Sequence, residues 1–547
     1  MTPVVLWGPA VHHLLPADQE CEAVAIDGKT IAAVGSRRAA RAAAGTGATE
    51  LRLDRGALLP GFVDAHHHGY LVVADPATDM LHRKASDIGG LLEFVRGKRD
   101  LPGGWLRLHG YEPLELAEMR SPTAREIDAV IADRPVHLIS RTYHESSVNS
   151  LGLELLGYDR KSHKTAGVLR NRRGHPTGVL LEGASFVAEA ASRPAIDHGL
   201  VHERLAWHVE RLLAAGITTI CDAAVPMDAA DGYVAEAADL GMRVVPLVVG
   251  ERIDTPILTA GRTAKVLADG GEYCHLCLTA RQVGSLTAAS VSASFSRGGR
   301  LARAMGRRAG FPTPDGHGRF RTGITVTGTR EMQTLIEAAA IGDAKLAVHA
   351  IGNGAVRSVL DARNGARNGS DLPLRVEHAM ALDLRDAELL AKAGLPVVAQ
   401  PGFLDAFGHQ LNAVPLPAPI RLMPFSSLLG AGVELAFSSD FPAANLNPWP
   451  GIASAVNRTD RTGRVILGEE SISVQAAIAA YTTTAADVLG LDAGRIEPGA
   501  PADLVWVEPD PFTASDDLLA RVETLATWSG GILRFAAAGS GLESYTS

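Results

Sequence analysis

Short apolar runs recur through the middle of the chain, and most are followed by a segment in which apolar residues have helical spacing. The runs lie at residues 61–66, 217–223, 244–249, 264–268, 346–350, 374–379, 396–401 and 433–440. Continuous apolar runs separated by helical segments are typical of parallel strands that are buried on both faces. Eight β/α units of this kind predict an α/β fold, a TIM (β/α)8 barrel whose strands close into a cylinder.

Two long stretches interrupt this β/α rhythm. Helical spacing is clear at 202–216, 330–340 and 384–394, and it is weakest before the fourth apolar run. Residues from about 70–200 follow the first strand, and residues 279–329 follow the fourth, without fitting the repeat. Barrels accept insertions in the loops at the C-terminal ends of their strands, so we expect both stretches to lie at that face.

Both ends of the chain have a different pattern, in which short strand-like runs alternate with turns. The pair Asp27-Gly28 between two such runs predicts a hairpin. The C-terminal segment repeats this pattern. We therefore predict a small discontinuous β-sandwich domain made from residues 1–59 and 487–547, with the barrel occupying residues 60–486.

Composition narrows the class of protein. The chain has 547 residues, of which 46% are hydrophobic and 21% charged, as in ordinary soluble proteins of more than one domain. A net charge of −9 argues against nucleic-acid binding. The N-terminus lacks a basic region and no run of 18 apolar residues occurs, so we expect neither a signal peptide nor a membrane span. Four cysteines are too few for a disulfide framework, which predicts the reducing cytoplasm.

A histidine run, His66-His67-His68, comes at the end of the first predicted strand. Residues two apart on a strand point to the same side, so His66 and His68 can converge while His67 points elsewhere. Two converging imidazoles are a common start of a metal site. The alternative interpretation is a solvated loop.

Four more polar side chains fall at corresponding places in other predicted strands: Lys265, His349, His378 and Asp440. Each has an ordinary alternative on its own: a core histidine, a helix-capping aspartate, or a lysine paired with Asp269 or Glu272. In a barrel, however, these strand ends share one mouth, where active sites assemble. Nitrogen and oxygen ligands suit one or two divalent metal ions, zinc in the first place, with iron, manganese or nickel as alternatives.

These residues and the segments around them give the chain a family resemblance. It resembles the amidohydrolase superfamily, and within it the branch of the N-substituted formamide deformylases. The similar segments cover nearly the whole chain in order: 59–68, 144–153, 175–184, 264–271, 346–353, 374–379, 437–442 and 494–508. The resemblance implies a metal-dependent hydrolase that cleaves a C–N bond of an amide, formamide or cyclic amide with metal-activated water.

The resemblance also implies roles for individual residues. The implied metal ligands are His66, His68, His349, His378 and Asp440, of which Asp440 is also the implied catalytic residue. Lys265 stands where many relatives carry a carboxylated lysine that bridges two metal ions. Glu182 is a rival for that anionic bridge.

Three further positions are implied to bear on the substrate. His144 matches a position that reaches the substrate region in similar proteins. Asn353 stands where relatives usually have an aspartate, and His109 stands where they tend to have glycine. Asparagine at 353 removes a charge beside an implied ligand histidine, which is expected to affect ligand orientation or substrate choice. Histidine at 109 either narrows the pocket or is tolerated.

Other functions remain alternatives at this point. A heterocycle deaminase of the same superfamily would use the same ring of ligands, but such enzymes usually have a glutamate that residues 346–353 do not supply. A non-catalytic barrel scaffold would lose ligands that this chain keeps. A phosphotriesterase-like activity has only an arginine-rich stretch in its favour, which is otherwise a surface loop: Arg297, Arg300, Arg303, Arg307, Arg308, Arg319 and Arg321.

We expect the partner to be a small-molecule substrate, with a homodimer as the favoured oligomer. The substrate pocket is expected to come from both insertions and from residues 403–417. Phe403, Phe407, His409 and the region of Trp449 are candidates to line it, although core packing is the ordinary fate of each.

Overall fold

The computed structural model describes residues 2–8, 10–12, 21–75, 77, 80–101, 104–159, 165–194, 198–249, 257–258, 261–271, 273–295, 299–300, 304, 312–316, 318–367, 369, 372–413 and 416–545. All eight predicted barrel strands are present: β7 (Phe62–His67), β13 (Ile217–Pro226), β14 (Arg243–Val249), β15 (Thr263–Leu267), β19 (Lys345–Gly352), β20 (Leu374–Leu382), β21 (Val397–Ala399) and β23 (Leu435–Phe437). They pair in parallel in the order of the chain, which confirms the barrel.

The last strand returns to the first and nearly closes the cylinder. The Asp440 N–H donates to the His66 carbonyl at 2.8 Å, and the His68 N–H donates to the Phe441 carbonyl at 3.0 Å. These bonds lie at the C-terminal ends of β7 and β23, so they bring two predicted site segments together. A short strand, β22 (Arg421–Leu422), adds antiparallel to β20.

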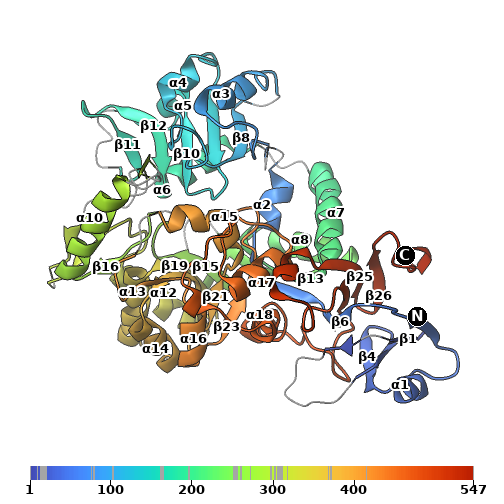
Figure 1. Cartoon of the computed structure of the whole chain (residues 1–547). Coiled ribbons are helices and arrows are strands. Elements are labelled where there is room, and N and C mark those ends of the chain that lie inside the picture. Colours follow the sequence, from blue (N-terminus) through green and yellow to red (C-terminus); the bar gives the residue numbers. More distant parts are fainter. Residues whose placement is uncertain are drawn as a thin grey trace.

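Helices surround the barrel strands (Figure 1). They are α2 (Gly69–Ala74), α7 (His198–Ala214), α8 (Ala230–Asp239), α12 (Thr329–Ile341), α13 (Asn353–Gly365), α14 (Leu384–Lys392), α16 (Phe425–Ala431), α17 (Pro448–Asn457), α18 (Val474–Ala480) and α19 (Thr483–Leu489). The predicted helices at 202–216, 330–340 and 384–394 are thus confirmed as α7, α12 and α14. Most of the interval before β15 lies outside the described residues.

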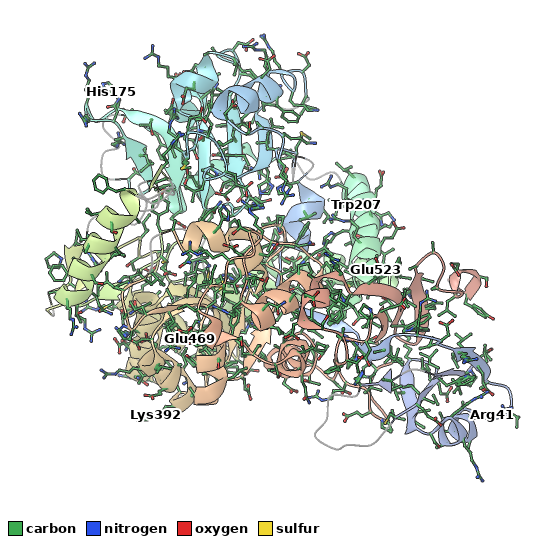
Figure 2. All side chains as sticks on the ribbon, in the orientation of Figure 1. Arg41, His175, Trp207, Lys392, Glu469 and Glu523 are labelled. Carbon is green, nitrogen blue, oxygen red and sulfur yellow. The ribbon has the colours of Figure 1, made fainter. Side chains whose placement is uncertain are left out.

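The first insertion folds into a lobe of its own beside the barrel (Figure 1). It is a five-stranded sheet in the order β11-β12-β10-β9-β8. Its elements are α3 (Ile88–Arg96), β8 (Leu106–Tyr111), α4 (Ala124–Asp128), β9 (Val136–Ser140), β10 (Glu145–Val148), α5 (Ser150–Leu155), β11 (Val168–Arg170), β12 (Pro176–Leu181) and α6 (Gly183–Ser192). Figure 2 shows His175 at the outer edge of this lobe, away from the barrel. The sequence predicted where this insertion begins but not that it forms a sheet.

The second insertion is shorter. It contains β16 (Cys277–Leu278), α10 (Ala280–Ser294), β17 (Thr313–Pro314) and β18 (Phe320–Arg321). Thr279 and Gln282 form a capping box at the start of α10. The side chain of each residue accepts a hydrogen bond from the backbone N–H of the other. A further helix, α15 (Gly402–Leu411), follows β21.

Both ends of the chain combine in two sheets that share one apolar core, as predicted. The first has the order β4-β3-β1-β5 and the second the order β2-β6-β24-β25-β26. Their strands are β1 (Val4–Trp7), β2 (Ala10–Val11), β3 (Ala23–Asp27), β4 (Thr30–Gly35), β5 (Thr49–Arg52), β6 (Ala57–Pro60), β24 (Leu504–Glu508), β25 (Glu523–Ser529) and β26 (Ile532–Ala536). The antiparallel pairing of β6 with β24 joins the two ends.

The predicted hairpin connects β3 and β4, and Gly28 adopts φ +59 there, a backbone conformation that favours glycine. Helix α1 (Arg37–Ala44) covers the first sheet, and three short 3-10 segments complete the chain: η1 (Gly468–Glu470), η2 (Asp516–Arg521) and η3 (Glu543–Tyr545). The domain boundaries at 1–59, 60–486 and 487–547 stay a prediction. Within the described part of the chain, no helix is long and apolar enough to cross a membrane.

Candidate metal centre

Three of the predicted residues, His66, His68 and Asp440, form a compact group of donor atoms at the barrel mouth, which we call the metal group. His66 lies near the end of β7, His68 directly follows that strand, and Asp440 follows β23. The Asp440 Oδ1 lies 3.0 Å from His68 Nε2 and 3.5 Å from His66 Nε2. One donor atom from each residue lies within 4.8 Å of the others. Two imidazoles and a carboxylate at this spacing can share one divalent cation.

His349 and His378 extend this group along the next strands. The ring centroid of His378 lies 5.0 Å from that of His66 and 4.4 Å from that of His349. The Lys265 Nζ lies 3.2 Å from His66 Nε2. The structure therefore brings all six predicted residues to one place, with His349 and His378 outside the 4.8 Å group.

Each of the three buried imidazoles is held through one of its ring nitrogens by a partner outside the metal group. His66 Nδ1 lies 2.5 Å from Glu377 Oε2, and His378 Nδ1 lies 2.7 Å from Gln400 Oε1. His349 bonds to the backbone of Gly270. Its Nε2 is buried and has no hydrogen-bond partner among the described residues. Metal-ligating histidines commonly have this arrangement, in which the second nitrogen is fixed by an outer partner, so these residues fit a metal.

The protonation states of these side chains also fit a metal site. Burial lowers the pKa of His66, His349 and His378 well below the usual value for an imidazole, so their lone pairs are free at neutral pH. Burial by itself would raise the pKa of Asp440, but the imidazoles of His66 and His68 and the Lys265 amine lower it further than burial raises it. Asp440 is therefore a carboxylate at neutral pH.

The backbone at two of these residues adopts a rare conformation. His378 has φ +77 and Asp440 has φ +50. Residues other than glycine seldom occupy this left-handed region, which costs on the order of 1–3 kcal/mol and persists where the surrounding structure imposes it. For Asp440 that constraint is the bond from its N–H to the His66 carbonyl, which aims the carboxylate at the histidines.

Several supporting residues escaped the sequence analysis. Glu377 holds His66 and also accepts a bond from Arg375 Nε at 2.6 Å. Asp64 accepts bonds from the Ser439 N–H at 2.9 Å and the Ser439 hydroxyl at 2.5 Å, and so joins the first strand to the last. The sequence held a signal for Glu377. Arg375 and Glu377 carry opposite charges two residues apart in an apolar strand, so their side chains lie on one face and can pair.

We expect Glu377→Gln to weaken metal binding about 10- to 100-fold, since partners of ligand histidines contribute that much to affinity. The amide can still contact Arg375 and His66, but it no longer gives His66 a charged partner. Competition with a chromophoric chelator measures the metal affinity. The control is Glu434→Gln at an exposed position before β23. An unchanged affinity in Glu377→Gln would refute this role.

His67 points away from the metal group, as the strand alternation predicts. Its Nδ1 lies 3.0 Å from Asp64 Oδ2, and its Nε2 lies 2.9 Å from His208 Nε2 on α7. The histidine run is not a solvated loop, because His66 and His67 are buried.

His144 and Glu182 act as a pair at the edge of the group. His144 Nδ1 lies 2.8 Å from Glu182 Oε2, and the His144 ring centroid lies 5.2 Å from that of His349. The other oxygen of Glu182 accepts the Gly271 N–H at 3.1 Å. Both carboxylate oxygens are thus engaged outside the metal group, so Glu182 supports His144 and is a poor bridge between ions.

His109 and Asn353 have packing roles in the structure. His109 is buried in β8 and stacks on Tyr143 with ring centroids 4.2 Å apart. Asn353 accepts the Cys277 N–H at 2.9 Å and donates to the Cys277 carbonyl at 3.2 Å. Neither side chain lines the cavity in front of the metal group, because each is used to hold neighbouring backbone or rings in place.

That cavity measures about 1750 Å³ and lies between the barrel mouth and both insertions. His66, His68, Lys265, His349, His378, Asp440 and His144 contribute to its wall. Of the four candidates to line the cavity, Phe403 and Phe407 do so, whereas His409 does not. Trp449 is buried against Phe62, with ring centroids 5.4 Å apart. The site is therefore open to a substrate considerably larger than the metal group.

None of the described arginines of the arginine-rich stretch lines this cavity. Arg300 donates to the Ala117 carbonyl, and Arg319 lies 3.6 Å from Cys277 Sγ. Arg321 ends β18, and the remaining four arginines of the stretch, Arg297, Arg303, Arg307 and Arg308, lie outside the described residues.

Comparisons with known proteins agree with this architecture. The model of a family described as the amidohydrolase family matches residues 53–534. An N-substituted formamide deformylase of Arthrobacter pascens is 28% identical over 95% of this chain and 96% of its own length. Two solved structures, each titled an uncharacterized metal-dependent hydrolase, share the fold. The one from Pyrococcus horikoshii has a TM-score of 0.65 at 20% identity, covering 94% of this chain and 99% of its own. The one from Pyrococcus furiosus has a TM-score of 0.62 at 21% identity, covering 93% and 100%.

Proposed function

The chain belongs to the amidohydrolase family, and from that membership we propose that it hydrolyses the C–N bond of a small-molecule formamide, amide or cyclic amide. It is a metal-dependent hydrolase that acts on non-peptide C–N bonds. The observation that carries the choice of reaction is the Asp440 carboxylate, 3.0 Å from His68 Nε2 and facing a large cavity. The formamide deformylase among its relatives supports the same bond type.

We propose that His66, His68, His349, His378 and Asp440 hold one or two divalent ions, with zinc favoured by the nitrogen and oxygen donors. When bound, such an ion lowers the pKa of water toward about 7 and polarises a carbonyl.

Lys265 is the residue we propose to link two ions, as a carbamate. Burial lowers the pKa of its amine, although Glu377 and Asp440 oppose this. A lower pKa gives more of the neutral amine, which is the form that adds carbon dioxide and loses a proton to become an anionic ligand.

Protein side chains would move the protons. Asp440 is ionised and buried, so it can take the proton of the attacking water and pass it to the nitrogen that leaves. We propose that His144 stabilises the substrate carbonyl oxygen as negative charge develops. Burial alone would lower the pKa of His144, but the Glu182 carboxylate raises it above its usual value. The protonated ring is therefore more populated than in a free histidine.

The test is a screen of the protein loaded with zinc or manganese against N-formyl amines, N-acyl amines and cyclic amides. Release of an amine together with formate or another carboxylate is the expected result, and the same protein stripped by a chelator should be inactive. Release of ammonia from a heterocycle would instead identify a deaminase. Absence of both activities, with no metal bound, would identify a scaffold.

Location and assembly are further parts of the proposal. All four cysteines are free, which is what a protein of the reducing cytoplasm needs. We expect a homodimer, the commonest oligomer of soluble proteins. Light scattering after size-exclusion chromatography measures the oligomeric state.

A further inference from the structure

We propose that Arg141 binds a carboxylate of the substrate, so that the substrate is an N-formyl or N-acyl compound that carries both a carboxylate and an apolar group. This inference rests on the proposed function for the bond that is cleaved. It adds the chemical class of what surrounds that bond.

Arg141 lies on a short turn that reaches from the insertion toward the metal centre. The turn joins β9 to β10, and the Tyr143 N–H donates to the Ser140 carbonyl at 3.1 Å. Such a turn keeps its two end Cα atoms within about 7 Å. His144 follows on the same turn, with its ring 5.2 Å from that of His349. Arg141 and His144 both line the cavity in front of the metal centre.

The guanidinium of Arg141 is buried but poorly satisfied. Its side chain is only 7% exposed, and among the described residues neither Nε nor Nη2 has a hydrogen-bond partner. Glu112 Oε2 lies 3.9 Å from Nη2, which is too far for a hydrogen bond. Buried charged groups are normally hydrogen-bonded, so this arginine has donor capacity that the protein itself does not use.

The unused atoms are those that match a carboxylate. Nε and Nη2 form one edge of the guanidinium, and that edge can donate two parallel bonds to two carboxylate oxygens. Arg357 in this protein uses the same edge on Asp386, with Nε at 2.6 Å from Oδ1 and Nη2 at 3.2 Å from Oδ2. A substrate carboxylate that reaches this edge would complete a pair of the same geometry.

The surroundings hold Arg141 in place before a substrate arrives. The guanidinium lies over the Phe407 ring at 4.6 Å. Glu112 is itself fixed by the Leu114 N–H, which donates to its Oε1 at 3.2 Å, so it restrains the arginine by charge. A side chain that is already ordered loses little entropy on binding, which favours affinity.

The other features of the cavity agree with this substrate class. Arg193 also lines the cavity, but it is 39% exposed and pairs with Glu189 at 2.6 Å, so it is not a free buried cation. Phe403, Leu411 and Leu416 line the same cavity and suit an apolar group on the substrate.

Two compounds that differ only by a carboxylate test the proposal: N-formylphenylalanine and N-formylphenethylamine. For the wild-type protein we expect kcat/KM to favour the carboxylate compound by about 30- to 100-fold, the usual effect of charge-assisted hydrogen bonds. Arg141→Met should abolish this preference, because it lowers kcat/KM for the carboxylate compound far more than for the neutral compound. Arg193→Met, a matched loss of charge at the cavity edge, should keep the preference.

A structural role for Arg141 would give a different pattern. Equal kcat/KM for both compounds in the wild type, or an equal loss for both in Arg141→Met, would overturn the proposal. Arg141→Lys keeps the charge without the two-bond edge, and it should lose most of the preference even if Arg141→Met does not fold. Glu112→Gln should strengthen the preference, because it removes a competing carboxylate.

Calorimetric binding of both compounds separates this inference from the proposed function. Binding needs no turnover, so a selective, Arg141-dependent affinity for N-formylphenylalanine supports the inference even if neither compound is cleaved. Failure of cleavage alone counts against the reaction, and equal binding of the two compounds counts against the carboxylate site.

Discussion

Asp440→Asn should lower kcat by about 10²- to 10⁴-fold, the range for loss of a general acid–base residue. The amide cannot accept a proton at neutral pH, whereas the carboxylate is ionised because its histidine and lysine neighbours keep its pKa below the usual value. The amide oxygen can still lie near His66 and His68, so the variant should retain most of its metal. Steady-state kinetics and elemental analysis of the same sample measure the two effects.

The control for this variant is Asp343→Asn, since Asp343 is exposed in the turn before β19, ahead of the N-terminal end of that strand. It should leave both kcat and metal content unchanged. A metal-loaded Asp440→Asn protein with full activity would eliminate Asp440 as the base. A protein that lost its metal together with its activity would show that Asp440 acts mainly as a ligand.

Lys265→Met should lower the number of bound ions, and it should lower the activity by about 100-fold or more. Residues that only hold a metal ligand in place already contribute about 10- to 100-fold to metal affinity or activity. The reason is that methionine cannot form a carbamate and so cannot link two ions. Methionine is close to lysine in length, and the site is buried, so the fold should persist. Metal content, kcat/KM and the thermal unfolding midpoint are the measurements.

A spectroscopic readout separates the carbamate from a simple lysine. Wild-type protein prepared with ¹³C-bicarbonate should show a carbamate carbon signal that Lys265→Met lacks. Lys345→Met, which changes an exposed lysine at the start of β19, should keep the signal. A wild-type protein that binds two ions without this signal would show that Lys265 is not the bridging ligand. Glu182 would then be the next candidate, despite its bonds to His144 and Gly271.

The barrel was predictable because its strands are buried on both faces, and this leaves a continuous apolar run that is visible without any knowledge of the partners. The metal group was predictable for a related reason. Equivalent ends of parallel strands meet at one mouth, so a polar residue at the end of each run has a defined place. His66, His349 and His378 could therefore be assigned to one site before any distance was known.

Other features depend on contacts between segments that are far apart in the chain. Glu377 faces His66 only because β20 lies across the barrel from β7, and Asp64 meets Ser439 only because the last strand closes on the first. No local pattern encodes such partners. The same limit explains His109 and Asn353, whose positions suggested the substrate but whose side chains pack on Tyr143 and Cys277.

The sequence by itself determined the barrel, the sandwich formed by both ends and the set of candidate metal ligands at the strand ends, because periodicity and strand ends are local properties. Only the tertiary structure decided how the insertion folds and that its turn brings Arg141 over the cavity. It also decided that His144 is paired with Glu182 beside His349. The physical reason is that a pocket is formed by surfaces that approach from different parts of the chain, and their distances arise only when the whole chain packs.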